Sequence, residues 1–192
     1  PRVRRQRQMC IRDRFNLSGY VADFHGAVLD SRLTATRFRR GISTYNGLRG
    51  TSGDGNRTLW NTSISYPLMG SYWFITPKIT YSLTHYNDIK HARAEIDKSS
   101  TRSLPIYSLD TGLIFERNST VFGRETEQTL EPRLFYAYIP YRNQRHMPNF
   151  DSSSADLNFA ELFTPNKYTG FDRIANTNQL SAVLTTRYID SG

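Results

Sequence analysis

Long runs in which apolar and polar side chains alternate are the clearest feature of this chain. In residues 128–144, one side of the run carries Leu130, Pro132, Leu134, Tyr136 and Tyr138. The positions between them carry Thr129, Glu131, Arg133 and Ala137, with Phe135 as the exception. A period of two is typical of an extended strand whose faces meet different surroundings. The pattern therefore predicts a two-sided β-strand.

The length of such runs separates a membrane strand from a soluble one. Residues 73–85 alternate almost without interruption, whereas strands of soluble proteins usually end after ~5–6 residues. This run would extend roughly 43 Å at ~3.3 Å per residue, or about 30 Å of depth at a tilt of ~45°. That depth matches the hydrocarbon core of a bilayer.

Further segments show the same pattern with varying clarity, at residues 15–24, 31–38, 60–68, 105–117 and 179–189. We expect the first two to form a hairpin, and residues 60–68 to pair with 73–85 across a short turn at 69–71. About seven strands are therefore predicted. The expected fold class is all-β, an antiparallel transmembrane β-barrel segment that forms a partial arc of a large outer-membrane barrel.

The connections divide into short turns and long polar segments, the asymmetry typical of outer-membrane barrels. Long segments lie at residues 50–55 and 87–102, and the longest at 141–177. The longest one contains enough aromatic side chains to fold on itself. Within it, residues 154–163 are expected to form a short helix, capped by one of Ser152, Ser153 and Ser154.

The cost of burying charge in lipid predicts which face of each strand is toward lipid and which is toward the barrel interior. A Lys or Arg that faces lipid at midplane costs ~2–4 kcal/mol, so the polar positions are expected to line the inside of a barrel. The candidate lumen-lining residues are Thr76, Lys78, Thr80, Ser82, Thr84, Asp110, Glu116, Glu131, Arg133 and Arg187. For Glu131 and Arg133, a structural pair across neighbouring strands is a stronger expectation than contact with a substrate.

Two residue types near the strands carry further expectations. Tyrosines near strand ends suit an interfacial girdle, and the candidates are Tyr72, Tyr86, Tyr107, Tyr138, Tyr141 and Tyr188. Prolines remove a ladder donor, so bulges or local breaks in pairing are expected at Pro67, Pro77, Pro105, Pro132 and Pro140.

Composition narrows the class further. The chain has 192 residues and a net charge of +8, and it lacks a run of ~18 apolar residues that could form a membrane-spanning helix. Residues 1–14 contribute +5 of that charge, so no nucleic-acid partner is inferred from the rest. Residues 5–14 resemble translated sequencing-adapter sequence, and we expect residues 1–14 to be a non-native basic tail ahead of a partial barrel domain at 15–192.

Signals for catalysis are weak. The four histidines lack metal-ligand spacing, there is no GxSxG motif, and GTSGDGNRT lacks the lysine of a phosphate-binding loop. No catalytic residue, metal site or cofactor is therefore predicted, and the chain is not expected to be an enzyme.

Several motifs in order resemble the barrel of the LPS-assembly protein family. They are QTLEPRLFYAYIPYRNQ at residues 128–144, PNFDSS at 148–153, GFDRI at 170–174 and Asn178-Gln179. The likeness covers roughly residues 15–192 and is specific from about Leu104 onward. Because the predicted strands are too few to close a barrel, we expect the chain to be a piece of a longer protein.

The resemblance implies a Gram-negative outer-membrane translocon that inserts lipopolysaccharide into the outer leaflet. It implies as partners lipopolysaccharide, a plug lipoprotein, outer-membrane lipid, and a periplasmic bridge reached through a preceding domain. This chain would supply wall and loop, with Asp151, Asp172 and Arg173 as candidates for loop or partner contacts. Another porin or transporter barrel, or a soluble sugar-binding β-sandwich, stay open as alternatives.

Overall fold

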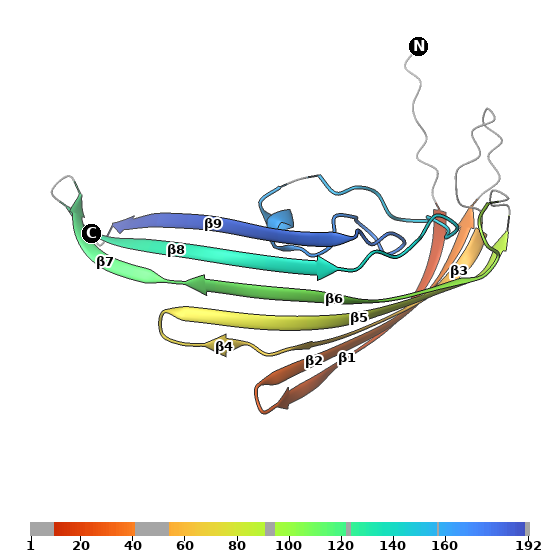
Figure 1. Ribbon diagram of the computed structural model, residues 1–192, viewed down its shortest axis with the longest axis horizontal. Coiled ribbons are helices and arrows are strands. Elements are labelled where there is room, and N and C mark those ends of the chain that lie inside the picture. Colours follow the sequence, from red (N-terminus) through yellow and green to blue (C-terminus); the bar gives the residue numbers. More distant parts are fainter. Residues whose placement is uncertain (1–9, 41–53, 91–94, 122–123, 157, 191–192) are drawn as a thin grey trace, which may run out of the picture.

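A single curved antiparallel sheet makes up most of the molecule (Figure 1). The computed structural model describes residues 10–40, 54–90, 95–121, 124–156 and 158–190. Its strands are β1 Cys10–Phe24, β2 Ala27–Arg40, β3 Asp54–Ser65, β4 Leu68–Met69, β5 Trp73–Lys90, β6 Ser100–Leu113, β7 Phe115–Val121, β8 Arg124–Ile139 and β9 Thr177–Asp190. In the described residues the sheet is an open arc, which confirms the predicted fold class.

The strands pair in the order β1–β2–β3–β5–β6–β8–β9, with β4 also beside β5 and β7 also beside β8. Short and long connections fall at opposite ends of the sheet. β1 and β2 are joined at His25 and Gly26, whose φ angles of 52° and 86° suit the tight turn of a hairpin. β5 and β6, and β8 and β9, are joined at the opposite end. Residues 140–176, here called the long loop, turn back over one face of the sheet near that end (Figure 1).

Register and alternation divide the sheet into two faces. Lys78 lies beside Ser108, and Ser108 beside Ala137, while the next positions bring Ile79 beside Tyr107 and Tyr107 beside Tyr138. We call the face that carries Lys78 and the long loop the inner face, and the other the outer face. All ten candidate lumen-lining residues lie on the inner face.

Prolines lie where the ladders are interrupted or end, as expected. Pro77 faces the gap between the β3 pairing at Lys78 and the β4 pairing at Ile75. Pro132 lies opposite the break between β6 and β7. Pro105 precedes the β6 residues that pair with β8, and Pro140 directly follows β8. Each missing donor therefore falls where one neighbouring strand is not bonded.

The run at 128–144 passes from strand to loop as expected, with β8 ending at Ile139. Other local predictions need correction. The helix expected at 154–163 is only the 3-10 turn η1, Ala160–Phe163, and its N-cap is Phe159 rather than a serine. The segment at 105–117 is broken at Ile114 into β6 and β7.

The run predicted at 60–68 is divided between β3, which ends at Ser65, and β4, so Met69 lies in a strand and not in the turn expected at 69–71; its pairing with β5 is as expected. The other strand predictions hold, with wider bounds. The expected hairpin is β1 and β2, and the run at 179–189 lies within β9. β4 was not foreseen, and most of the segment at 50–55 lies outside the described residues. Of the expected basic tail, residues 1–9 lie outside them too, while Cys10 to Arg14 pair with β2. The non-native origin of residues 1–14 stays a prediction.

Gly112 tests the packing of the inner face at the break between β6 and β7. An added Cβ would lie 2.6 Å from the Phe74 ring and 3.2 Å from the Pro132 carbonyl oxygen. We expect Gly112→Ala to lower the free energy of unfolding by ~1–3 kcal/mol, because backbone and ring cannot both give way. Urea unfolding of the full-length protein in lipid vesicles measures this. Gly19→Ala, which meets nothing within 4 Å, is the matched control; equal effects of the two changes would contradict the packing.

Candidate functional site on the inner face

Asp172 is the centre of a polar cluster between the long loop and the sheet. Its side chain is fully buried. Oδ1 accepts hydrogen bonds from Arg57 Nη1 at 2.7 Å and from the Tyr86 hydroxyl at 2.9 Å. Oδ2 accepts from the backbone N–H groups of Phe150 and Asp151, at 2.6 and 2.7 Å. One carboxylate thus joins two strands of the wall to two distant parts of the loop.

Arg57 on β3 completes the charge balance of this cluster. Its guanidinium binds Asp172 and also donates two hydrogen bonds of 2.8 Å to the two carboxylate oxygens of Asp151. The rings of Phe38 and Phe171 lie 5.0 and 5.4 Å from the guanidinium carbon. Stacking on aromatic rings and forked binding of carboxylates are what distinguish arginine from lysine, so Lys would not replace it.

Arg102 on β6 binds backbone carbonyl oxygens and one amide side chain of the long loop, and not its carboxylates. Nη1 donates to the carbonyl oxygen of Asp172 at 2.6 Å and to the Gln144 side chain at 2.8 Å, and Nη2 donates to the carbonyl oxygen of Phe171 at 2.9 Å. Gln144 in turn bonds both backbone groups of Ile174. These bonds fix the path of residues 171–174 along the wall. We call Arg57, Tyr86, Arg102, Gln144, Asp151 and Asp172 the loop anchor.

Apolar packing surrounds the anchor. Phe150 stacks on Phe38 of β2 with ring centroids 4.2 Å apart, and Ile174 packs with Leu104 of β6 and Ile139 of β8. Gly170, at φ 72°, lies so close to Asp151 that any Cβ would collide with its carbonyl oxygen. Excluding water in this way strengthens each charged hydrogen bond and raises the cost of losing one partner.

The two carboxyl groups respond differently to this setting. Burial raises the pKa of Asp172 above its ordinary value of 3.8, and the charge of Arg57 offsets only part of that effect. Burial also acts upward on Asp151, but its hydrogen bonds with Arg57 outweigh it and hold the pKa of Asp151 at about 2. Asp151 is therefore the member whose charge the fold stabilises.

Farther along the inner face, cross-strand charge pairs hold the β6–β8–β9 region. Arg133 Nε donates to Asp110 Oδ1 at 2.8 Å, and its guanidinium carbon lies 4.0 Å from the Phe163 ring centre in η1. Arg187 and Glu131 form a second pair at 3.4 Å. Glu131 and Arg133 thus each form a structural pair with a residue of a neighbouring strand, as expected.

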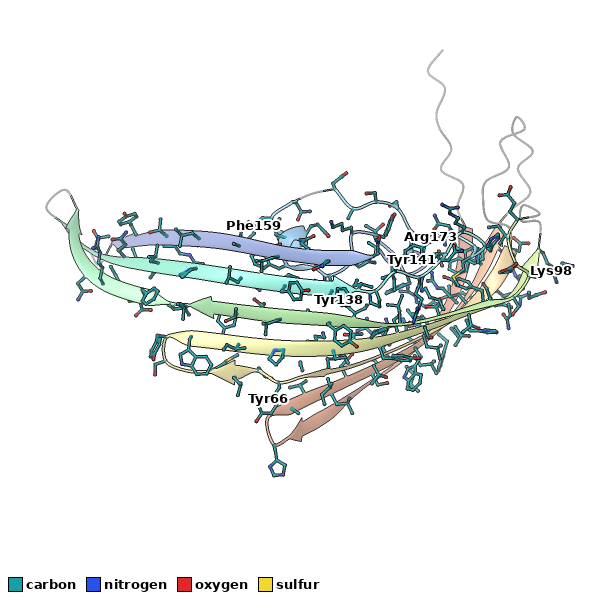
Figure 2. The ribbon with its side chains drawn as sticks, viewed as in Figure 1. Tyr66, Lys98, Tyr138, Tyr141, Phe159 and Arg173 are labelled. Atoms are coloured by element: carbon teal, nitrogen blue, oxygen red, sulfur yellow. The ribbon has the colours of Figure 1, made fainter. Side chains whose placement is uncertain are left out.

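The structure brings together two of the three predicted loop-contact residues. Asp151 and Asp172 meet in the anchor. Arg173, labelled in Figure 2, instead donates to the Met147 carbonyl oxygen at 2.9 Å. Tyr86 is fully buried and bonded to Asp172, so its assignment to an interfacial girdle was wrong. The lumen-lining role of the ten inner-face residues stays a prediction; two of them, Ser82 and Thr84, are buried.

Sequence reasoning missed Arg57, Arg102 and Gln144. The first two stand at inner-facing positions of strands, so the alternation could have flagged them as charged residues that need a partner. Their partners lie 115 and 70 residues away, and no local pattern indicates such distances. Among the described residues, no group of His, Cys, Asp and Glu could hold a metal ion, and no helix is long and apolar enough to span a membrane.

An antiparallel wall with an apolar outer face, a polar inner face and a long loop anchored inside defines the class: a segment of a β-barrel of the outer-membrane type. Residues 14–192 match the family described as LPS transport system D. The chain therefore belongs to that family.

Curated relatives agree with this assignment. The chain is 45% identical over 155 residues to the LPS-assembly protein LptD of Paraburkholderia xenovorans, covering 77% of this chain and 20% of the relative. It is 41% identical over 183 residues to that of Bordetella pertussis, covering 91% and 23%. For the Nitrosospira multiformis protein, the identity is 44% over 138 residues, covering 72% and 15%. The chain thus spans about a fifth of the length of these relatives.

Replacing Asp172 tests the anchor. In Asp172→Asn the charge of Arg57 loses its most buried partner, so we expect the free energy of unfolding to fall by ~3–5 kcal/mol. The long loop should also become sensitive to protease in the folded full-length protein. Urea unfolding and limited proteolysis measure the two effects. Asp156→Asn, on the exposed part of the same loop, is the control, and a loop equally resistant in both variants would refute the anchor.

The lowered pKa of Asp151 predicts a pH dependence with a definite sign. A carboxyl whose folded pKa lies below its unfolded value stabilises the fold fully above pH ~4, and that contribution is lost as the pH falls through about 2. We expect the free energy of unfolding of wild type to exceed that of Asp151→Asn by roughly 2 kcal/mol at pH 6, and this difference to disappear as the pH approaches 2. Urea titrations of both proteins across this range measure the gap, and a gap independent of pH would contradict the assignment.

Proposed function

We propose that this chain is part of the wall and loop of the outer-membrane translocon that inserts lipopolysaccharide into the outer leaflet. Family membership supports the assignment to lipopolysaccharide transport, since the curated relatives are LPS-assembly proteins. The division of the sheet into two faces supports the role. The outer leaflet is reached only through the membrane, and a wall that separates lipid from a polar interior is what such a passage requires.

The outer face carries the strongest support for membrane contact. Large apolar side chains stand exposed there along several strands, among them Ile79 at 48%, Leu134 at 45% and Leu184 at 67%. A soluble protein rarely leaves so much contiguous apolar surface open to water. Lys78 and Arg133, each one position from such a residue, point to the other face.

Polar groups on the outer face bond to one another, as an environment without water demands. Trp60 Nε1 donates to the Ser31 hydroxyl at 3.0 Å, and Ser31 also bonds Thr62 at 3.0 Å. The Tyr136 hydroxyl donates to Asn178 at 3.0 Å. These pairs lower the cost of placing hydroxyl and amide groups against acyl chains, which supports the proposal over a soluble sugar-binding β-sandwich.

The inner face suits an anionic, sugar-rich headgroup through its hydroxyls, amides and paired charges. Thr76, Lys78 and Thr80 lie on the inner face, and none of them belongs to the loop anchor. The loop itself narrows the interior, and its exposed Phe159 and Ala160 offer a contact surface for a plug lipoprotein (Figure 2). Delivery from a periplasmic bridge is assigned to parts of the full-length protein beyond this chain. No cofactor or bond-making step is part of the proposal.

Depleting the full-length protein from its bacterium tests the function. We expect lipopolysaccharide on intact cells, measured with an antibody against its sugars, to fall while cellular lipopolysaccharide accumulates. Re-expression of wild type and of the surface-loop variant Arg145→Gln should restore the surface level. If depletion leaves surface lipopolysaccharide unchanged, but lowers uptake of a small solute, the porin alternative replaces the proposal.

A further inference from the structure

A hollow on the outer face lies across β1, β2 and β3, toward the end of these strands that carries the long connections. Its volume is about 400 Å³. The side chains that face it belong to outer positions of the three strands: Asp13, Phe15, Ala35, Arg37, Asn56 and Thr58. The small side chain of Ala35 leaves the space, because Phe15 and Thr58 stand on either side of it in register.

The hollow lies where the outer face changes from apolar to polar. The next outer positions toward the short turns are Leu33 and Trp60, which pair with each other and are 37% and 44% exposed. Toward the long connections the same face of β2 carries Arg37 and Arg39, both exposed. A guanidinium costs ~0–1 kcal/mol at this depth rather than the several required at midplane.

The two arginines are available to a ligand. Within the described residues, neither guanidinium takes part in an ion pair or a hydrogen bond. Arg37 and Arg39 are two positions apart on one face of β2, so their side chains are neighbours. The amide of Asn56, in register with Arg37, adds a further donor at the rim.

We propose that this hollow binds the phosphate group of a membrane lipid in the leaflet on the long-connection side. Arginine forks match phosphate oxygens in pairs, and a phosphate at the polar edge of the belt meets Arg37 first. The alkyl carbons next to the phosphate lie over Ala35 and against the Phe15 ring. The inference rests on the membrane placement in the proposed function, but it does not require that the protein carry lipopolysaccharide.

Asp13 also lines the hollow and faces Arg37 across the β1–β2 ladder. It belongs to residues 1–14, which the sequence analysis expects to be a non-native tail, and it precedes residue 14, where the family match begins. The proposal therefore rests on Phe15, Ala35, Arg37 and Arg39.

Calorimetric titration of the folded full-length protein in a neutral detergent tests the site. The probe is dihexanoyl phosphatidic acid, compared with dihexanoyl glycerol and with inorganic phosphate. We expect saturable binding of the phosphatidic acid alone, weakened about tenfold or more in Arg37→Gln/Arg39→Gln. Arg145→Gln, an exposed loop arginine, should match wild type.

Each other outcome overturns the assignment. Equal affinity of wild type and the double arginine variant places the lipid elsewhere, and equal binding of inorganic phosphate shows a site for free anions instead of lipid. Retained heat-modifiable gel mobility of each variant shows that its barrel is folded. Membrane fractionation distinguishes failure of the lipid site from failure of the proposed function. A protein found outside the outer membrane contradicts the proposed membrane placement, whereas the titration of the purified protein still shows whether the arginines bind the lipid.

Discussion

The buried contact between Asp172 and Arg57 is the constraint on which the inner face depends. A carboxylate with no exposed surface requires donors on every side, and here they come from β3, β5 and residues 150 and 151 of the long loop. These donors come together only where the loop lies against both strands. The path of the long loop therefore depends on the wall.

This constraint explains why a long connection is an ordered part of a barrel wall. A loop of this length bears a large conformational entropy, and surface loops rarely bury enough to offset it. Here Phe150, Phe171 and Ile174 pack against strands, while Arg102 holds the backbone of residues 171–174. Under the proposed membrane placement the outer face follows a separate rule, with apolar side chains such as Ile79 and Leu134 toward lipid and Arg37 and Arg39 near the ends of the strands.

Alternation alone predicted the architecture, because the two faces of a strand are a local property of sequence. It separated Lys78 from Ile79 and Arg133 from Leu134, and it located most strands. It could not find the partners of Arg57 or Arg102, since these depend on how residues 140–176 fold back. Tyr86 was misplaced for the same reason: a tyrosine near a strand end suits a membrane interface until a buried carboxylate meets its hydroxyl.

Amide hydrogen exchange at Phe150 and Asp151 tests the central claim most directly, because both N–H groups donate to Asp172. In the folded full-length protein, these two amides should exchange as slowly as those of the strand ladders, and much faster in Asp172→Asn. Exchange at the rate of an open loop in the wild-type protein would show that Asp172 does not hold residues 140–176 on the inner face, and the account would be wrong.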